Sequence, residues 1–198
     1  MKRPLSYLKA IVICHGKSEK QLCDFLKSNL RLKIFVDSDK KGEKSIQITS
    51  VIKRLKDKRF RNLDSFIKEF SDVEVCKNKT KKYLSKEFKI FIIMDTDDCT
   101  EKQKMDFIDK SMFKNHWAYD HIIPIYNSPE LETVLEKANI KFEKKGSARK
   151  KEYIKIFPTD MKYQTSEMIQ IEEFCNNLKR VKDTNLDEFV QFCLDLSK

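Results

Sequence analysis

The sequence predicts an α/β fold in which helices flank a mostly parallel sheet and a helical tail follows at the C-terminus. Two observations support this prediction. Short runs rich in Ile, Val and Phe, typical of buried strands, occur at residues 8–14, 90–94 and 122–126. Between them, apolar side chains recur at helical spacing. Strands that alternate with helices in this way build a parallel sheet.

Five strands are expected, each a run of β-branched or aromatic residues that ends at a turn residue or a polar loop. They are residues 8–14, 34–36, 45–48, 89–94 and 122–126. The first stops at His15-Gly16 and the last at Asn127. The basic segment at residues 77–82 is expected to be a loop or the start of a helix.

The helices follow from apolar side chains that repeat every three or four positions and from polar residues suited to a first turn. They are expected at residues 18–30, 49–59, 62–70, 100–113, from Pro129 onward, and at 149–157, 166–180 and 186–196. Pro129 suits a first turn because its φ is fixed and it has no N–H to satisfy. We expect residues 1–140 to form the α/β domain and residues 141–198 a helical extension packed on the same core.

Composition narrows the class of protein. The net charge of +10 over 198 residues favours a polyanionic partner such as nucleic acid. No apolar run approaches the roughly 20 residues of a membrane helix, and the first residues do not form a signal sequence, so we expect a cytoplasmic protein without membrane contact. Six cysteines without paired short spacing, and three histidines, argue against a zinc site or a disulfide framework.

Polar residues follow three of the predicted strands, at residues 15–19, 95–98 and 127–132. Because the carboxyl ends of parallel strands share one edge of a sheet, we expect these groups to converge. Side chains alternate along an extended chain, so Asp95 and Asp97 share a side while Asp98 turns away. Two carboxylates on one side suit Mg²⁺ or Mn²⁺. The alternative is that these acids only cap a helix and face solvent.

The chain resembles the Toprim family of catalytic domains, particularly its RloB-like and OLD-nuclease branches, over about residues 8–140. The first element of the family is a Glu-Gly turn after the first strand, often with a second Glu three residues beyond the Gly, and here Gly16 and Glu19 match the Gly and that second Glu. Asp95 and Asp97 match the Asp-x-Asp strand end, and residues 130–132 match the later acidic segment. The resemblance implies a Rossmann-like Toprim domain with metal-dependent phosphodiesterase activity. It further implies a nuclease on DNA or RNA, a role in restriction or phage defence, and an ATPase partner.

The same resemblance implies roles for individual side chains. The metal ligands it implies are Glu19, Asp95, Asp97, Glu130 and Glu132, of which the first three are also catalytic. Resemblance favours Glu132 and proximity to the strand end favours Glu130, so the sequence does not choose between them. The alternative for both is that the helix macrodipole alone favours acids in a first turn. His15 replaces the leading Glu of the family pattern. An imidazole can accept a proton or bind Mn²⁺, which keeps His15 a catalytic candidate, or it only shapes the turn. In that case the chain is a degenerate module that binds nucleic acid or an ATPase without catalysis.

Basic residues supply candidate phosphate contacts. Lys17 lies at a predicted helix N-terminus, where backbone N–H groups also favour phosphate. Further candidates lie in two runs of basic residues interleaved with aromatic ones. They are Lys53, Arg54, Arg149, Lys150 and Lys151. The alternative is that these runs are solvated helix faces.

Overall fold

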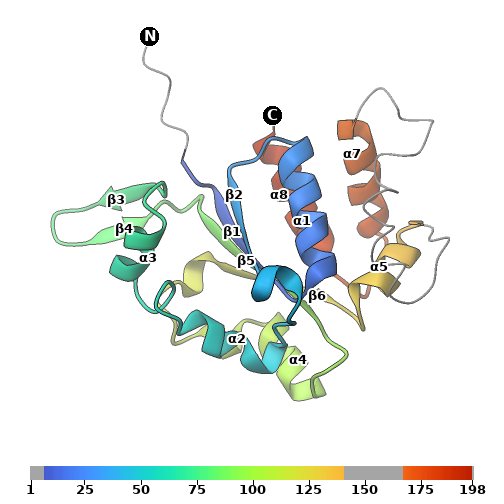
Figure 1. Ribbon diagram of the computed structural model, residues 1–198, viewed down its shortest axis with the longest axis horizontal. Helices are drawn as coiled ribbons and strands as arrows, with labels where there is room; N and C mark the ends of the chain where they lie inside the picture. The colour runs from blue at the N-terminus through green and yellow to red at the C-terminus, as the bar shows by residue number, and fades with distance from the viewer. Residues whose placement is uncertain (1–6, 141–166, 198) are drawn as a thin grey trace, which may run out of the picture.

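A four-stranded sheet forms the centre of the structure, a computed structural model that describes residues 7–140 and 167–197 (Figure 1). Its strands are β1 (Ala10–Cys14), β2 (Ile34–Asp37), β5 (Lys89–Asp95) and β6 (Ile122–Asn127). They lie in the order β2-β1-β5-β6, and every neighbouring pair is parallel. The predicted α/β fold with a parallel sheet is confirmed, and the arrangement is Rossmann-like.

Helices cover both faces of the sheet, which explains why its strands are continuous apolar runs. Along β1, Ala10, Val12 and Cys14 face one apolar cluster, whereas Ile11 and Ile13 face the other. All five side chains are fully buried. A change of register in this strand would exchange the two sets, so the matched clusters fix its position.

One face is covered by the first helix together with the last three described helices, which stand beside one another in Figure 1. These helices are α1 (Lys17–Asn29), α5 (Leu131–Lys137), α7 (Glu167–Leu178) and α8 (Leu186–Leu196). Phe189 of α8 meets Phe91 of β5 edge-on, with ring centroids 5.0 Å apart. The described part of the C-terminal tail therefore shares its apolar cluster with the sheet.

The other face carries α2 (Ile48–Leu55), α3 (Leu63–Glu69) and α4 (Glu101–Ile108), with short 3-10 turns η1 (Lys40–Gly42), η2 (Ser111–Phe113) and η3 (Tyr119–His121). Phe60, Phe66 and Phe113 are fully buried beneath these elements. The helix expected at residues 100–113 is interrupted because Lys110 takes a left-handed conformation, with φ 67°. Residues after it therefore form η2.

Two predictions are wrong in this region. Residues 45–47 form no strand, and Ile48 already begins α2; hydrogen bonds between Ser50 and the backbone of Gln47 start the helix there. The basic segment at residues 77–82 takes part in an antiparallel hairpin of β3 (Val75–Lys77) and β4 (Lys82–Leu84).

The predicted helix at residues 149–157 lies outside the described residues. Within residues 7–140 and 167–197, no helix combines the length and the apolar character that a bilayer crossing requires.

Candidate functional site

A pocket of about 530 Å³ lies where β1, β5 and β6 end. Its position follows from the strand order, because β2 lies on one side of β1 and β5 on the other, and parallel sheets open a crevice where the winding direction reverses. The residues that line it are His15, Gly16, Lys17, Ser18, Glu19, Gly42, Glu43, Ser45, Asp95, Asp97 and Glu130. Most of the acidic residues singled out in the sequence are thus brought together.

The pocket is acidic, although the chain as a whole carries +10. Its carboxylates belong to Glu19, Glu43, Asp95, Asp97 and Glu130. Lys17 and His15 are the basic side chains among the lining residues. Acids gathered in a recess of a basic protein repel one another, so the pocket favours a cation.

Glu19 is held at the N-terminus of α1. Gly16 is the N-cap of this helix, and its backbone N–H donates to Glu19 Oε2 at 2.8 Å. The Glu19 side chain is 1% exposed. This bond is the backbone half of a capping box, so the rules that begin the helix also place the carboxylate at the pocket.

Asp95 is the last residue of β5 and joins this strand to the start of α5. Its Oδ1 accepts from the backbone N–H of Leu131 at 3.1 Å and from Asn127 Nδ2 at 3.3 Å. Asn127 lies opposite Asp95 in the β5-β6 register, and its own Oδ1 accepts from Thr184 Oγ1 at 3.1 Å. Thr184 is a supporting residue that sequence reasoning missed, because no motif marks it.

The charged form of Asp95 is disfavoured. The pKa of this carboxyl is raised to about 8, mainly by burial and then by the negative charge of Glu19, with a smaller contribution from Glu132. The charge of His15 and the Asn127 hydrogen bond act in the opposite direction. A cation in the pocket would reverse this balance, since it favours the carboxylate form.

Glu130 and Glu132, which the sequence did not separate, occupy different positions. Glu130 is the N-cap residue of α5 and lines the pocket. Glu132 is 1% exposed, and its Oε1 accepts a 2.8 Å hydrogen bond from the Ser18 hydroxyl. Glu130 therefore faces the pocket space, whereas Glu132 fastens α5 to the first turn of α1.

His15 and Asp97 complete the acidic edge. His15 follows β1 directly, and its backbone is bonded on both sides. The backbone N–H of His15 donates to the Ile93 carbonyl at 2.8 Å, and the His15 carbonyl accepts from the backbone N–H of Ile46 at 2.7 Å. Its Nδ1 is buried without a hydrogen-bond partner among the described residues. Asp97 is exposed and lines the pocket, whereas Asp98 does not.

The turn η1 forms a wall of the pocket that the sequence did not predict. Gly42 has φ +90°, and a Cβ atom added there would lie 2.9 Å from Lys17 Cα. Only a glycine lets this turn approach the head of α1 so closely. The glycine after two lysines was the available signal, because it suits a left-handed turn position.

Hard divalent cations match the pocket in the type of donor and in charge. However, no group of three or more His, Cys, Asp or Glu side chains within residues 7–140 and 167–197 is arranged as a finished metal cage. Glu19 and Asp95 instead accept hydrogen bonds that hold the fold. An ion would therefore have to draw the side chains together as it binds.

The basic candidates differ in their availability. Lys17 is exposed at the pocket. Lys53 and Arg54 line a neighbouring groove of about 600 Å³ along α2, which shares Ser45 with the acidic pocket. Arg54 donates from Nε and Nη2 to the buried carboxylate of Asp37, so much of its charge is neutralised. The remaining candidates, Arg149, Lys150 and Lys151, lie outside the described residues.

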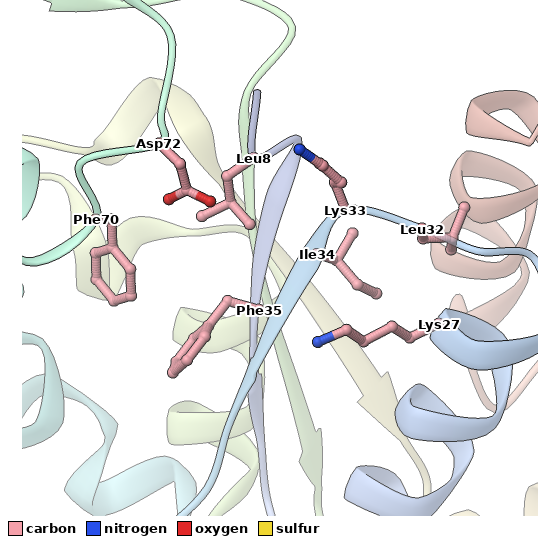
Figure 2. A pocket seen from close by; sticks show the side chains of 8 residues that line it. All are labelled: Leu8, Lys27, Leu32, Lys33, Ile34, Phe35, Phe70 and Asp72. Carbon is pink, nitrogen blue, oxygen red and sulfur yellow. The ribbon is translucent and has the colours of Figure 1, made fainter. Parts of the chain in front are cut away.

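A smaller hollow of about 280 Å³ lies at the opposite, amino-terminal edge of β1 and β2. Figure 2 shows Phe35 and Phe70 on one side of it and Lys27 and Lys33 on the other. It holds one acid, Asp72, and no group of titratable side chains comparable to the acidic pocket. The acidic pocket is therefore the better candidate for chemistry.

Comparisons with known proteins do not add to this picture: no protein-family model, curated protein or solved structure matches the chain.

Proposed function

We propose that this protein is a phosphodiesterase that cleaves DNA or RNA with the help of Mg²⁺ or Mn²⁺. The observation that carries the proposal is the acidic pocket at the switch point of the sheet, where Glu19, Asp95, Asp97 and Glu130 meet beside His15. The Toprim resemblance of the sequence supports the same activity. Like charges repel at close range, so a cation between these acids and a phosphate group would favour its approach.

A bound divalent ion would neutralise phosphate oxygens and lower the pKa of an attacking water. The chain's own part is to supply the ligands and to orient the substrate. Glu19 and Asp95 are positioned by the backbone of α1 and α5, whereas Asp97 and Glu130 lie on the loops around them. Lys17 offers a positive charge to the phosphate at the same pocket.

The groove along α2 extends this site for a nucleic acid strand. It is lined by Lys44, Lys53, Arg54 and Lys56, with Asp39 and Asp57 as its acids. Lys44 lies 3.7 Å from Asp39, and Arg54 is bound to Asp37, so Lys53 and Lys56 are the better phosphate contacts. A strand whose phosphate lies in the pocket would place its neighbouring phosphates along these lysines.

Cleavage assays test the proposal directly. The purified protein is incubated with labelled DNA and RNA, single- and double-stranded, in Mg²⁺, Mn²⁺ or EDTA. We expect metal-dependent cleavage that falls at least 100-fold in Asp95→Ala, because the carboxylate at the end of β5 is lost. The matched control is Asp98→Ala, which removes an adjacent acid that does not line the pocket. Absence of cleavage under every condition, or equal activity in both variants, would refute it.

A second candidate is a Toprim-like module that binds nucleic acid or an ATPase without cleaving. The observation in its favour is His15, which replaces the acid of the family pattern and leaves Nδ1 buried without a partner in the described structure. His15→Glu separates the two candidates. A large gain in Mn²⁺-dependent cleavage would identify an impaired enzyme, whereas no cleavage before or after the change would favour the binding module.

We extend the proposal to a restriction or phage-defence role with an ATPase partner, on the sequence resemblance alone. Expression of the chain with and without Asp95→Ala in a phage-sensitive host tests it. Protection that depends on Asp95 is expected, and equal plaque numbers for both proteins would argue against the role.

A further inference from the structure

The hairpin of β3 and β4 stands apart from the central sheet. Among residues 7–140 and 167–197, the two strands pair only with each other, from Val75 opposite Leu84 to Lys77 opposite Lys82. In Figure 1 the hairpin extends away from the helices and the main sheet. Its base is anchored, because Leu84 is buried and Val75 packs against the apolar cluster of that face. Residues 77–83, which form the outer part of the hairpin, are exposed and do not belong to this apolar cluster.

The outer part of the hairpin is strongly basic. All residues from 77 to 83 are exposed, and no acid occurs between residues 75 and 84. The lysines are Lys77, Lys79, Lys81 and Lys82. None of these four forms an ion pair with any residue that the structure describes. Four positive charges thus project from one narrow element without internal compensation.

The tip holds a defined shape. The backbone of Asn78 donates to the Lys81 carbonyl at 3.0 Å, and the Asn78 side chain accepts from the N–H groups of Thr80 and Lys81 at 3.2 and 2.8 Å. This turn is closed by hydrogen bonds at three points. The lysines are therefore presented from an ordered scaffold, which lowers the entropy cost of binding a partner.

The charges are placed where they destabilise the free protein. Lys77 and Lys82 are direct cross-strand partners, and like charges in that position oppose strand pairing. An anion shared by the two ammonium groups would relieve this repulsion. Tyr83, whose side chain is 43% exposed, adds an aromatic surface beside Lys82. The Lys77–Lys82 pair therefore does not stabilise the hairpin, but it suits the binding of a polyanionic ligand.

We propose that the β3-β4 hairpin binds duplex DNA by entering its major groove, with the lysines contacting phosphates on both walls. A two-stranded ribbon fits the roughly 12 Å width of that groove, whereas the major groove of duplex RNA is too narrow for side chains to enter. The inference rests on the proposed function in taking nucleic acid as the polyanion. It adds double-stranded DNA as the substrate class.

The hairpin is a contact separate from the acidic pocket. β4 leads into β5 at Lys89, whereas the pocket lies at the opposite end of β5, at Asp95. Seven residues of strand, at roughly 3.3 Å each, separate the two ends. Binding by the hairpin can therefore be measured without any contribution from catalysis.

The test measures binding of the full chain to a fluorescent duplex of about 20 base pairs of DNA in EDTA, where cleavage is suppressed. In the hairpin variant all four lysines, at positions 77, 79, 81 and 82, become Gln. The matched control makes the same change in charge at four exposed basic residues of other elements: Lys114, Lys179, Arg180 and Lys182. Circular dichroism and thermal melting confirm that both variants fold, as expected for exposed positions.

We expect the hairpin variant to bind duplex DNA at least 10-fold more weakly than the control. The slope of log affinity against log salt concentration should become shallower by about one unit for each phosphate that the hairpin no longer neutralises. Binding to duplex RNA of the same sequence should change by less than 3-fold relative to the control.

Three results would overturn the inference. They are equal weakening in the hairpin and control variants, equal weakening on DNA and RNA duplexes, and binding of anionic phospholipid vesicles in preference to DNA. None of them depends on cleavage, whereas the Asp95→Ala assay does not depend on the hairpin lysines. Failure of the inference is therefore distinguishable from failure of the proposed function.

Discussion

The Ser18 hydroxyl donates a 2.8 Å hydrogen bond to Glu132 across 114 positions of sequence, and both side chains are buried. The bond joins the first turn of α1, which carries Glu19, to the first turn of α5, which follows Glu130. The two helix starts that carry Glu19 and Glu130 are thus fixed to each other.

Ser18→Ala should therefore weaken the attachment of α1 to α5 and lower the free energy of unfolding. The change removes a donor to a buried carboxylate, and leaving a buried charged group without that partner costs about 1–3 kcal/mol. Urea denaturation is expected to show this decrease in unfolding free energy. Glu132→Gln is the control, since its amide oxygen still accepts from Ser18, and it should cost less. A Ser18→Ala protein as stable as the wild type would mean that the bond contributes nothing to the fold.

Asp95→Asn should change how stability depends on pH. Because the pKa of Asp95 in the folded protein is about 8, above its ordinary value of 3.8, the folded state retains a proton that the unfolded state releases. The contribution of Asp95 is fully present below about pH 4 and is lost as pH rises toward 8. In EDTA, the variant should gain on the order of 5 kcal/mol relative to the wild type between these limits, from about 1.4 kcal/mol for each pKa unit. Parallel stability curves would contradict the assigned environment of Asp95.

Divalent cations should stabilise the folded protein at pH 8. An ion that binds only the folded state raises its melting temperature by mass action, and an excess of 100 over Kd corresponds to about 2.7 kcal/mol. Thermal melting in Mn²⁺ is expected to show an increase of several degrees. Asp95→Asn and Glu19→Gln should abolish it, whereas Asp98→Asn should retain it. An increase that persists in all three variants would place the ion elsewhere.

Gly42→Ala should disturb the pocket wall more than Gly16→Ala. At Gly42 the added methyl group lies 2.9 Å from Lys17 Cα in a backbone with positive φ, whereas at Gly16 the nearest contacts are 3.4 and 3.6 Å, in ordinary van der Waals range. We expect Gly42→Ala to reduce stability by about 1–3 kcal/mol and Gly16→Ala clearly less. Denaturation midpoints compare the two, and the reverse order would show that η1 can move without penalty.

The central fold was predictable because its strands are buried on both faces. The runs at residues 90–94 and 122–126 are apolar at nearly every position, so they do not show the polar face of an amphipathic helix. The polar residues after them mark the strand ends. A strand was wrongly predicted at residues 45–48 because Ile46 and Ile48 alternate with polar residues, as they would in a strand. In the structure Ile46 hydrogen-bonds to His15, and Ile48 already belongs to a helix. A short alternating pattern cannot exclude that arrangement.

The candidate site was predictable only in part. Convergence of three strand ends follows from a parallel sheet, which is why Glu19, Asp95 and Asp97 could be singled out. The different positions of Glu130 and Glu132 depend on the partner of each side chain, and the Ser18 hydrogen bond spans too much sequence to be inferred. The β3-β4 hairpin escaped prediction because lysines are poor strand formers and its pairing is local to a short turn.

Thr184 lies far along the chain, yet it orients Asn127, which in turn donates to Asp95. Phe189 then covers β5 from α8. During synthesis, the residues of β1 and β5 therefore emerge from the ribosome long before the segment that fixes their acidic edge. The nascent chain therefore cannot complete the hydrogen bonds behind its acidic pocket until Thr184 and α8 have left the exit tunnel.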